Sequence, residues 1–526
     1  MRVVPLTSQV AKQTMDEQLE AMTSLAFISL NQTYVSRVPP TLFYSEPQEG
    51  ENQDPDETED DLPSRMVSIL SWIAICLVRD PQGDAVATAL SARSGTIMLY
   101  LARTQGLPDE KDIENSREFL FALRQAMAQK DPGSATDTLF KTTISISYRR
   151  FASKVGAIAR MEPLARGGTS KVVDRFNTIV DRWFASGGVE NDTCLLNFAR
   201  ELQIIATESH GTTVLKLVFG RLVNLIEKGL DYLSSGRDKQ AWAQTYCRCA
   251  LILVYSNFFA QFETEKSLAK GSKWYGTSAD LDWILKLWRR LWRVARYRVD
   301  AWSFATYGFQ FIQDALGEQS YSEFLRDGRN IHVSWVASGQ SSILPPNHGR
   351  PYPLPEPPLP LLQNTLEKYG YPSLDLDETH PFHQEFADSV RNLWPCGGAV
   401  PHLHSEIQLI KYFEQNETAV HRNYIGVSKL SCWACHAYIE EVNKKRAEEA
   451  EPWTILGTSN KANFEWLVPL DPFGLSVVNL IREELKQALG NLSKTLGTRG
   501  ISPASDESSS TDSDESRLPF LDVGFK

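Results

Sequence analysis

The sequence predicts an α+β protein of several domains, in which a mostly α-helical N-terminal domain precedes a smaller domain of mixed helix and strand. Three observations support this fold class. The chain has 526 residues, enough for roughly two to four domains of ordinary size. Apolar residues recur at intervals of three and four over residues 63–340, as in helices that bury one face. Further along, helical patterns flank a β-branched, strand-like run at residues 424–430.

The composition is that of a globular protein. Hydrophobic residues make up 42% and charged residues 23% of the chain, which excludes a disordered chain, a collagen and a coiled-coil rod. The net charge of −11 argues against a protein that coats duplex DNA without sequence preference, although it leaves room for a local basic face.

Cysteine usage and the N-terminus predict an intracellular protein, cytoplasmic or nuclear, with no membrane contact. Seven scattered cysteines make a poor disulfide framework and favour a reducing compartment. The first residues lack the apolar core of a signal peptide. The most apolar run, residues 66–78, is too short to span a bilayer and is expected to form a buried core helix.

The first part of the chain divides into two predicted regions. Residues 1–62 form an N-terminal segment with an acidic linker, because residues 46–61 contain no aliphatic or aromatic side chain that could be buried. Residues 63–340 form an all-α domain. Its clearest apolar stripe consists of Leu215, Val218, Phe219, Leu222, Leu225 and Ile226.

Three further regions follow. Residues 341–361 are rich in proline, which fixes φ and removes backbone donors, so an extended, semi-rigid connector is expected. A ligand for SH3 or WW domains is the alternative interpretation of this segment. Residues 362–490 form the second compact domain. Residues 491–526 form a disordered tail that is acidic and rich in serine.

The second domain contains the strongest chemical motif of the chain. His404 and Glu406 stand two positions apart at the start of an amphipathic helix. Cys432 and Cys435 open another helix, 28 residues after His404, and Ser431 is the expected N-cap of that helix.

These residue types suit a catalytic zinc site. Two cysteines three apart share one face of a first helical turn, where free N–H groups and the helix dipole favour the metal-binding thiolate. With the His404 imidazole they supply three ligands, which leaves the fourth tetrahedral position of Zn²⁺ open to water. Glu406 then remains available to carry protons. A His-x-Glu followed by Cys-x-x-Cys is the signature of zinc deaminases.

Three runs carry a resemblance to a known family: HSEIQLIKYF, NYIGVSKLSCWACHAYI and WTILGTSNKANFEWLVP. They resemble the OTT-type deaminase-like proteins of fungi and bacteria, a nucleic acid or nucleotide deaminase type of the cytidine deaminase-like superfamily. The resemblance covers roughly residues 395–475. It implies a three-layer α/β/α domain with a mixed sheet and with zinc between the starts of two helices.

The resemblance also implies a role for each motif residue. His404, Cys432 and Cys435 would be the zinc ligands. Glu406 would be the catalytic proton shuttle, which takes a proton from the zinc-bound water, passes it to a ring nitrogen and later protonates the leaving amine.

The chain departs from the family pattern in two places. The signature has proline before the first cysteine, where this chain has Ser431, and both residues suit a helix start. After the Gly-Thr of the third run the family often has His-Gly, where this chain has Ser459 and Asn460. If that loop contacts substrate, the second departure places specificity or turnover in question.

The expected function is a zinc-dependent hydrolytic deaminase. Its substrate would be a nucleobase, within a nucleoside, a nucleotide or a single-stranded nucleic acid, and Trp433, Trp466 and Asn460 are the candidate substrate contacts. One alternative is a catalytically inactive deaminase-fold interaction module with structural zinc. Another is a hydrolase of a different C–N bond, as in isopeptide-cleaving proteins. The oligomeric state stays open.

A different ligand set is a further alternative for the metal. His436 directly follows Cys435 and would complete a closed, structural site together with His421 or His402.

Two other patterns lie in the predicted helical domain. Residues 273–302 interleave tryptophans with arginines, and their apolar stripe consists of Leu281, Ile284, Leu285, Trp288, Leu291, Trp292 and Ala295. A core-facing helix with a solvated basic side is expected, and a docking face for nucleic acid or an acidic tail is the alternative. Cys247 and Cys249 point to different helix faces, which predicts buried thiols without a shared metal.

Overall fold

The computed structural model describes residues 8–34, 62–79, 84–105, 107–159, 161, 168–185, 212–234, 239–259, 278–337, 351–376, 379–394, 397–446, 450–459 and 461–499. These residues divide into two compact units. The first unit comprises the described residues of Met1–Ala74, Gln82–Glu110 and Ile331–Lys526, and the second those of Ile75–Pro81 and Lys111–Asn330. In the described residues, no helix is long and apolar enough to cross a membrane.

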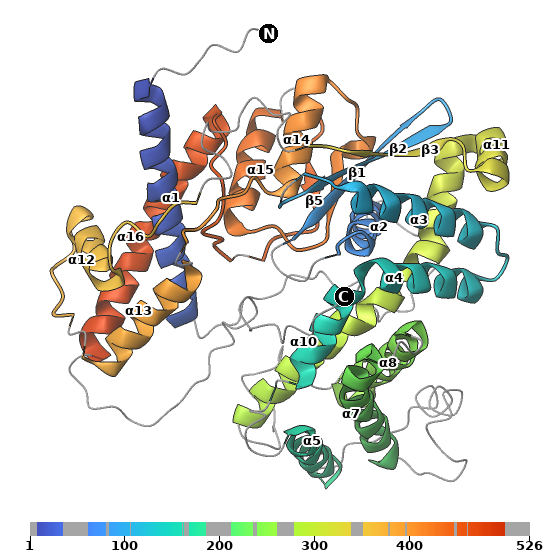
Figure 1. Ribbon diagram of the computed structural model, residues 1–526, viewed down its shortest axis with the longest axis horizontal. Coiled ribbons are helices and arrows are strands. Elements are labelled where there is room, and N and C mark those ends of the chain that lie inside the picture. The colour runs from blue at the N-terminus through green and yellow to red at the C-terminus, as the bar shows by residue number, and fades with distance from the viewer. Residues whose placement is uncertain are drawn as a thin grey trace. The chain divides into compact units, whose positions relative to one another are not determined.

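The first unit is built on a five-stranded mixed sheet with the strand order β3-β2-β1-β4-β5 (Figure 1). β1 pairs antiparallel with β2 and with β4, whereas β2 pairs parallel with β3 and β4 parallel with β5. The strands are β1 (Val86–Arg93), β2 (Thr96–Arg103), β3 (Ile331–Trp335), β4 (Tyr424–Val427) and β5 (Thr454–Ile455). The predicted α+β class with a mixed sheet is therefore confirmed.

A tight hairpin forms the start of this sheet. Ser94 and Gly95 connect β1 to β2 with φ values of 49° and 74°. Two consecutive positive φ angles characterise the type I′ turn, whose twist matches that of paired strands. Since β1 is the central strand, its first six residues are all buried.

Helices lie on both faces of the sheet. A Cβ atom at Gly426 of β4 would lie 2.1 Å from the Leu70 carbonyl carbon, so the backbone of α2 (Leu62–Cys76) lies directly against β4. Across the strands Gly426 is opposite Thr88, which is opposite Leu101. The next residue of β2, Tyr100, points to the other face, where its ring meets that of Phe413 from α14 (Ser405–Asn416) at 5.1 Å.

The remaining helices of the first unit are α1 (Ser8–Tyr34), α12 (Pro358–Lys368), α13 (Pro381–Leu393), α15 (Trp433–Arg446) and α16 (Pro472–Arg499), with a 3₁₀ turn η5 at His421–Asn423. α1 lies along α16 and α13 (Figure 1). Glu20 of α1 forms ion pairs of 2.9 Å with Lys368 of α12 and with Arg482 of α16.

The second unit is helical in its described residues. It contains α3 (Glu110–Met127), α4 (Pro132–Ala159), α5 (Gly168–Ala185), α7 (Thr212–Ser234), α8 (Lys239–Val254), α10 (Ser278–Ser303), a π-helical turn η3 (Phe304–Gly308) and α11 (Phe309–Asp327). The six residues of the apolar stripe predicted at 215–226 are all buried in α7. Cys247 and Cys249 are buried free thiols, as predicted.

The stripe predicted on α10 is only partly confirmed. Ile284, Leu291 and Ala295 are buried. Leu281, Leu285, Trp288 and Trp292 are only half-buried.

The prediction of an all-α domain at residues 63–340 is wrong. This range contains β1, β2 and β3, which belong to the same sheet as β4 and β5. The reason is that β1 pairs with β4 across more than 300 residues of sequence, as in the pairing of Ala87 with Val427. The helical periodicity of the surrounding sequence gives no indication that β1 pairs with β4.

The other predicted boundaries also move. α12 begins at Pro358, so the connector predicted at 341–361 ends in a helix, with proline in a position where its missing N–H costs nothing. Before it, Tyr352 forms a β-bridge with Ala399. α16 continues to Arg499, so the start of the tail predicted at 491–526 is helical.

The segment predicted at 1–62 contains the long helix α1, and the domain predicted at 362–490 lacks the strands that come from earlier in the chain. The acidic linker at 46–61 and the tail from residue 500 onward lie outside the described residues.

Candidate metal centre

The start of α14 is fixed by the end of β2. The Ser405 backbone N–H donates to the Thr104 hydroxyl at 3.2 Å, which satisfies one of the free donors of the first helical turn. The Gln408 side chain donates to the carbonyls of Arg103 at 2.9 Å and Leu403 at 2.6 Å. His404 is the N-cap residue, so its imidazole lies at the N-terminal end of this helix.

The start of α15 differs from the prediction in its N-cap residue. The helix begins at Trp433, which makes Cys432 rather than Ser431 the capping residue. The Cys432 sulfur accepts the backbone N–H of Cys435 at 3.5 Å, the bond that an N-cap side chain normally makes. The Ser431 carbonyl instead accepts the backbone N–H of Ser459 at 2.8 Å and the Thr458 hydroxyl at 3.0 Å.

His404, Cys432 and Cys435 meet between these two helix starts, with their ligand atoms all within 4.8 Å of one another. The His404 Nδ1 atom lies 3.1 Å from the Cys435 sulfur and 3.6 Å from the Cys432 sulfur. Tetrahedral zinc with sulfur and nitrogen ligands needs donor separations of about 3.6–3.8 Å. The 3.6 Å separation agrees with this value and the 3.1 Å separation is about 0.5 Å shorter, so the three donor atoms would have to move slightly apart to hold a zinc ion.

The electrostatics of the three groups also suit a cation. Burial raises the pKa of Cys432, but the hydrogen bond from Cys435 and the charge of His404 outweigh it and hold that pKa well below its usual value. Burial opposes the imidazolium form of His404, yet the nearby Cys432 thiolate raises its pKa to about 9. Burial and the Cys432 charge raise the pKa of Cys435. A divalent metal would displace the remaining protons, because it binds thiolates and neutral imidazole.

Glu406 faces the same group of ligands. It lies in the first turn of α14 and is 5% exposed. The charge of its carboxylate raises the pKa of both Cys435 and His404, so the carboxylate lies near these two groups. The Ser405 hydroxyl donates to Glu406 Oε2 at 3.4 Å. A carboxylate in this position can exchange protons with a group bound at the metal.

Asn463 was not among the site residues expected from the sequence, and it contacts the far side of the His404 ring. Its Nδ2 atom lies 3.3 Å from His404 Nε2, and its Oδ1 atom accepts the Glu465 N–H at 3.1 Å. When Nδ1 binds a metal, Nε2 carries the ring proton and needs an acceptor, so Asn463 can orient a metal-bound His404 only with its amide turned to present Oδ1 to the ring. The position lies within the third run that carries the family resemblance, which was the available signal.

The loop that carries Asn463 is held by the N-terminal helix. Gln18 of α1 donates to the Trp466 carbonyl at 2.9 Å and accepts the Val468 N–H at 2.8 Å. The Ala462 N–H donates to Gln32 of the same helix at 3.2 Å. Helix α1 thus contributes to the metal centre although it lies more than 370 residues upstream of His404.

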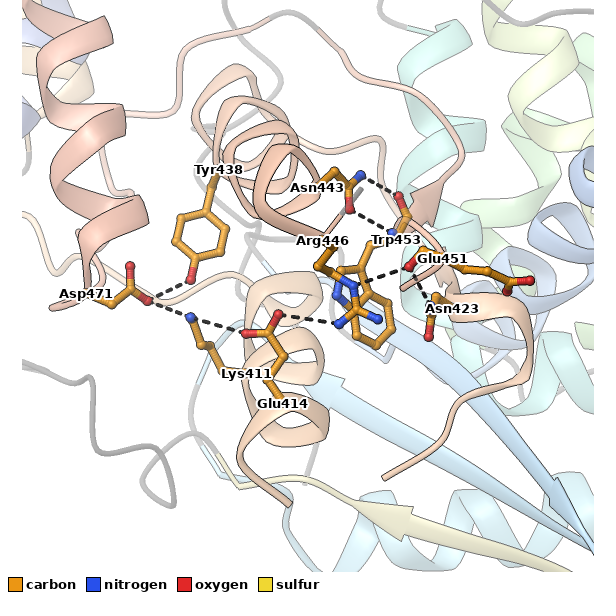
Figure 2. A network of polar contacts seen from close by, with 9 residues as sticks. All are labelled: Lys411, Glu414, Asn423, Tyr438, Asn443, Arg446, Glu451, Trp453 and Asp471. Atoms are coloured by element: carbon orange, nitrogen blue, oxygen red, sulfur yellow. Dashed lines mark hydrogen bonds and ion pairs between the residues drawn. The ribbon is translucent and has the colours of Figure 1, made fainter. Parts of the chain in front are cut away.

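A network of polar side chains joins α14, α15 and Asp471, the residue before α16 (Pro472–Arg499) (Figure 2). Lys411 of α14 pairs with Asp471 at 2.7 Å, and the Tyr438 hydroxyl of α15 donates to the same carboxylate at 2.7 Å. Burial and the Asp471 charge raise the pKa of Tyr438, so the phenol remains a donor. Since Tyr438 lies one turn after Cys435, these contacts fix α15 against α14.

The network continues to the end of α15 (Figure 2). Arg446 lies 3.7 Å from Glu414 of α14, and its guanidinium stacks over the Trp453 ring at 4.9 Å. Asn443 exchanges two hydrogen bonds with the backbone of Trp453, at 2.9 and 2.7 Å. The two helices that carry the candidate ligands are therefore held by these contacts in their middle and C-terminal parts.

The predicted substrate contacts have different outcomes. Trp433 is half-buried at the start of α15 and stays a candidate. Trp466 is 0% exposed within the hydrophobic core, a position that suits packing rather than contact with a ligand. Asn460 lies outside the described residues.

The alternative ligand sets do not form. His436 lies 3.3 Å from Glu440 of its own helix. Among the described residues, only His404, Cys432 and Cys435 make a group of potential metal ligands, so His402 and His421 do not join it.

Of the comparisons with known proteins, the one with protein families supports this site. Neither the curated proteins nor the solved structures contain a match to the chain. Residues 403–470, which include the three candidate ligands and Glu406, match the family described as OTT_1508-like deaminase, and this match confirms the family resemblance that the motifs indicated.

Proposed function

We propose that this protein is a zinc-dependent hydrolytic deaminase that acts on a nucleobase, within a nucleoside, a nucleotide or a single-stranded nucleic acid. One observation carries the proposal. The ligand atoms of His404, Cys432 and Cys435 lie within 4.8 Å of one another, and the charge of the Glu406 carboxylate acts on both His404 and Cys435. The deaminase family match over residues 403–470 supports the same chemistry.

Each residue has a distinct task in this proposal. His404, Cys432 and Cys435 would hold a zinc ion, which when bound would supply a hydroxide nucleophile near neutral pH. The Glu406 carboxylate would accept the proton released when the nucleophile forms and deliver it to the ring nitrogen; it would then accept a second proton, from the hydroxyl added to the ring carbon, and deliver it to the departing amine. Asn463, with Oδ1 turned to accept the Nε2 proton, would keep the His404 ring oriented so that Nδ1 faces the metal.

One observation favours the alternative of an inactive module with structural zinc. His404 and Cys432 are each 8% exposed and Cys435 is 0% exposed. Buried ligands are also typical of metal sites that only stabilise a fold. The two functions differ in what Glu406 does, because a purely structural site has no use for a proton carrier.

The test uses the full-length protein and its Glu406→Gln variant. Metal content and ammonia release are measured with a panel of cytosine and adenine nucleosides, nucleotides and single strands. We expect one zinc per chain in both proteins. The variant should lose ammonia release by about 10²- to 10⁴-fold, the usual contribution of a general acid–base residue.

Glu440→Gln is the matched control, because it removes an exposed carboxylate from α15. Its activity should equal that of the parent protein. Zinc binding without ammonia release from any substrate would establish the structural module instead. Equal activity in the Glu406→Gln variant would remove Glu406 from the mechanism.

A further inference from the structure

Cys432 and Cys435 are a pair of free thiols at the start of one helix. Cys432 directly precedes α15, and Cys435 lies in the first turn of that helix. The Cys435 N–H donates to the Cys432 sulfur at 3.5 Å, so this turn of backbone holds the two residues close together. Their sulfurs belong to a group of atoms that all lie within 4.8 Å of one another.

This arrangement is close to that of a disulfide. Residues three apart in a helical turn have Cα atoms about 5 Å apart. Disulfides connect residues whose Cα atoms are about 4.4–6.8 Å apart, so the backbone needs little change to join Cys432 to Cys435. Both thiols also contact His404 Nδ1, at 3.6 and 3.1 Å, and these polar contacts would be given up when the sulfurs join.

The two thiols differ in their access to solvent. Cys432 is 8% exposed, whereas Cys435 is 0% exposed. A small oxidant dissolved in water therefore reaches Cys432 first. Cys435 then has the position of a resolving thiol, the second cysteine that completes a disulfide with an oxidised neighbour.

We propose that Cys432 and Cys435, when no zinc is bound, form a reversible disulfide with hydrogen peroxide as the oxidant, and that this disulfide prevents zinc binding. The Cys432 sulfur attacks one peroxide oxygen, the O–O bond breaks, and the thiol proton leaves with the released hydroxide as water. The Cys435 sulfur then attacks the sulfur of the resulting sulfenic acid, the S–O bond breaks, and the second thiol proton leaves with that hydroxide as water. The sulfurs together lose two electrons, which reduce the peroxide to two molecules of water.

The disulfide and zinc exclude each other because they need the same two sulfurs. Zinc binds the thiolate form of cysteine, and a disulfide sulfur carries no negative charge. Oxidation would leave His404 as the one remaining ligand of the candidate group. The inference concerns regulation of the proposed deaminase site and rests on that proposal for its consequence, whereas disulfide formation itself requires no deaminase activity.

Peptide mass spectrometry of the full-length protein tests the proposal. The protein is freed of metal with a chelator, treated with hydrogen peroxide, alkylated under denaturing conditions and digested with trypsin. Both cysteines then lie in one peptide, between Lys429 and Lys444, and we expect its alkylation only after reduction with dithiothreitol. Cys247 and Cys249 are the internal control, because they are 0% exposed and point to different helix faces, and they should be alkylated without reduction.

Zinc binding and two variants provide separate readouts. The oxidised protein should lose zinc binding in chelator competition and regain it with dithiothreitol, while zinc-loaded protein should keep both thiols under the same peroxide treatment. Cys435→Ser should stop at the sulfenic acid of Cys432, which dimedone labels. Cys432→Ser should give no dimedone label at Cys435, since that residue is 0% exposed.

Several results would overturn the proposal: thiols that stay reduced in the metal-free protein, sulfinic acid in place of the disulfide, equal oxidation of Cys247 and Cys249, or undiminished zinc binding after oxidation. A dimedone label at Cys435 in the Cys432→Ser variant would overturn the assigned order of steps. The measurements on the parent protein remain decisive if the variants do not fold. A protein that forms the disulfide but releases no ammonia would support this inference and refute the deaminase proposal, so the two failures are distinguishable.

Discussion

Gln18, which is 1% exposed, is one of two side chains that join helix α1 to the loop beside the metal centre, and Gln32 is the other. The Gln18 amide donates to the Trp466 carbonyl and accepts the Val468 N–H, both in a buried environment. Gln18→Ala removes both bonds at once and leaves two backbone groups without partners. An orphaned buried polar group costs about 1–3 kcal/mol, so we expect a loss of about 2–6 kcal/mol in the free energy of unfolding.

Urea unfolding followed by fluorescence measures this loss. Gln18→Met separates the two contributions to it, because methionine preserves most of the side-chain volume but makes neither bond. A loss close to that of the alanine variant would assign the effect to the hydrogen bonds. Gln129→Ala is the control, since Gln129 is exposed and bonds only to Thr138 at 3.0 Å, and it should change stability by less than about 0.5 kcal/mol.

The same variant should weaken zinc binding, measured by competition with a chelator. The affected loop carries Asn463, whose amide contacts the His404 ring, so a looser loop orients that ligand less well. A Gln18→Ala protein with parental stability and zinc affinity would refute the role assigned to α1.

Three further predictions test other parts of the fold. Gly426→Ala should destabilise the protein by about 3 kcal/mol or more in thermal unfolding, because the new Cβ would collide with the α2 backbone. Gly220→Ala is the control: its new Cβ enters open space within α7, so the thermal stability should stay equal or rise. Burial opposes ionisation of Glu20, but its Arg482 and Lys368 partners lower its pKa below the usual value near 4.5. The ionised carboxylate therefore stabilises the folded protein fully above pH 4.5, and this stabilisation is lost as the pH falls through the lower pKa of the folded state. In acid unfolding curves, Glu20→Gln should abolish this pH-dependent part of the stability. Asn463→Ala should reduce zinc affinity about 10- to 100-fold in chelator competition, and unchanged affinity would show that His404 needs no such partner.

The sequence by itself determined the chemistry of the candidate site. His404 and Glu406 share one helix start, and Cys432 and Cys435 share another, so each half of the site depends on spacing within a single helical turn. The order of these motifs along the chain agrees with the deaminase family match over residues 403–470. Local periodicity likewise predicted α2, α7 and α14, because the buried face of an amphipathic helix consists of apolar residues three and four positions apart in the sequence.

Only the tertiary structure decided what surrounds those ligands. The pairing of β1 with β4, the close approach of Gly426 to α2, and the contacts of Gln18 with the loop at 461–468 all join residues more than 300 positions apart. Each depends on backbone groups, which every residue type carries, so no residue pattern marks the partner in advance. The core position of Trp466 has the same origin, since a tryptophan suits a core and a binding surface equally well until its neighbours are known.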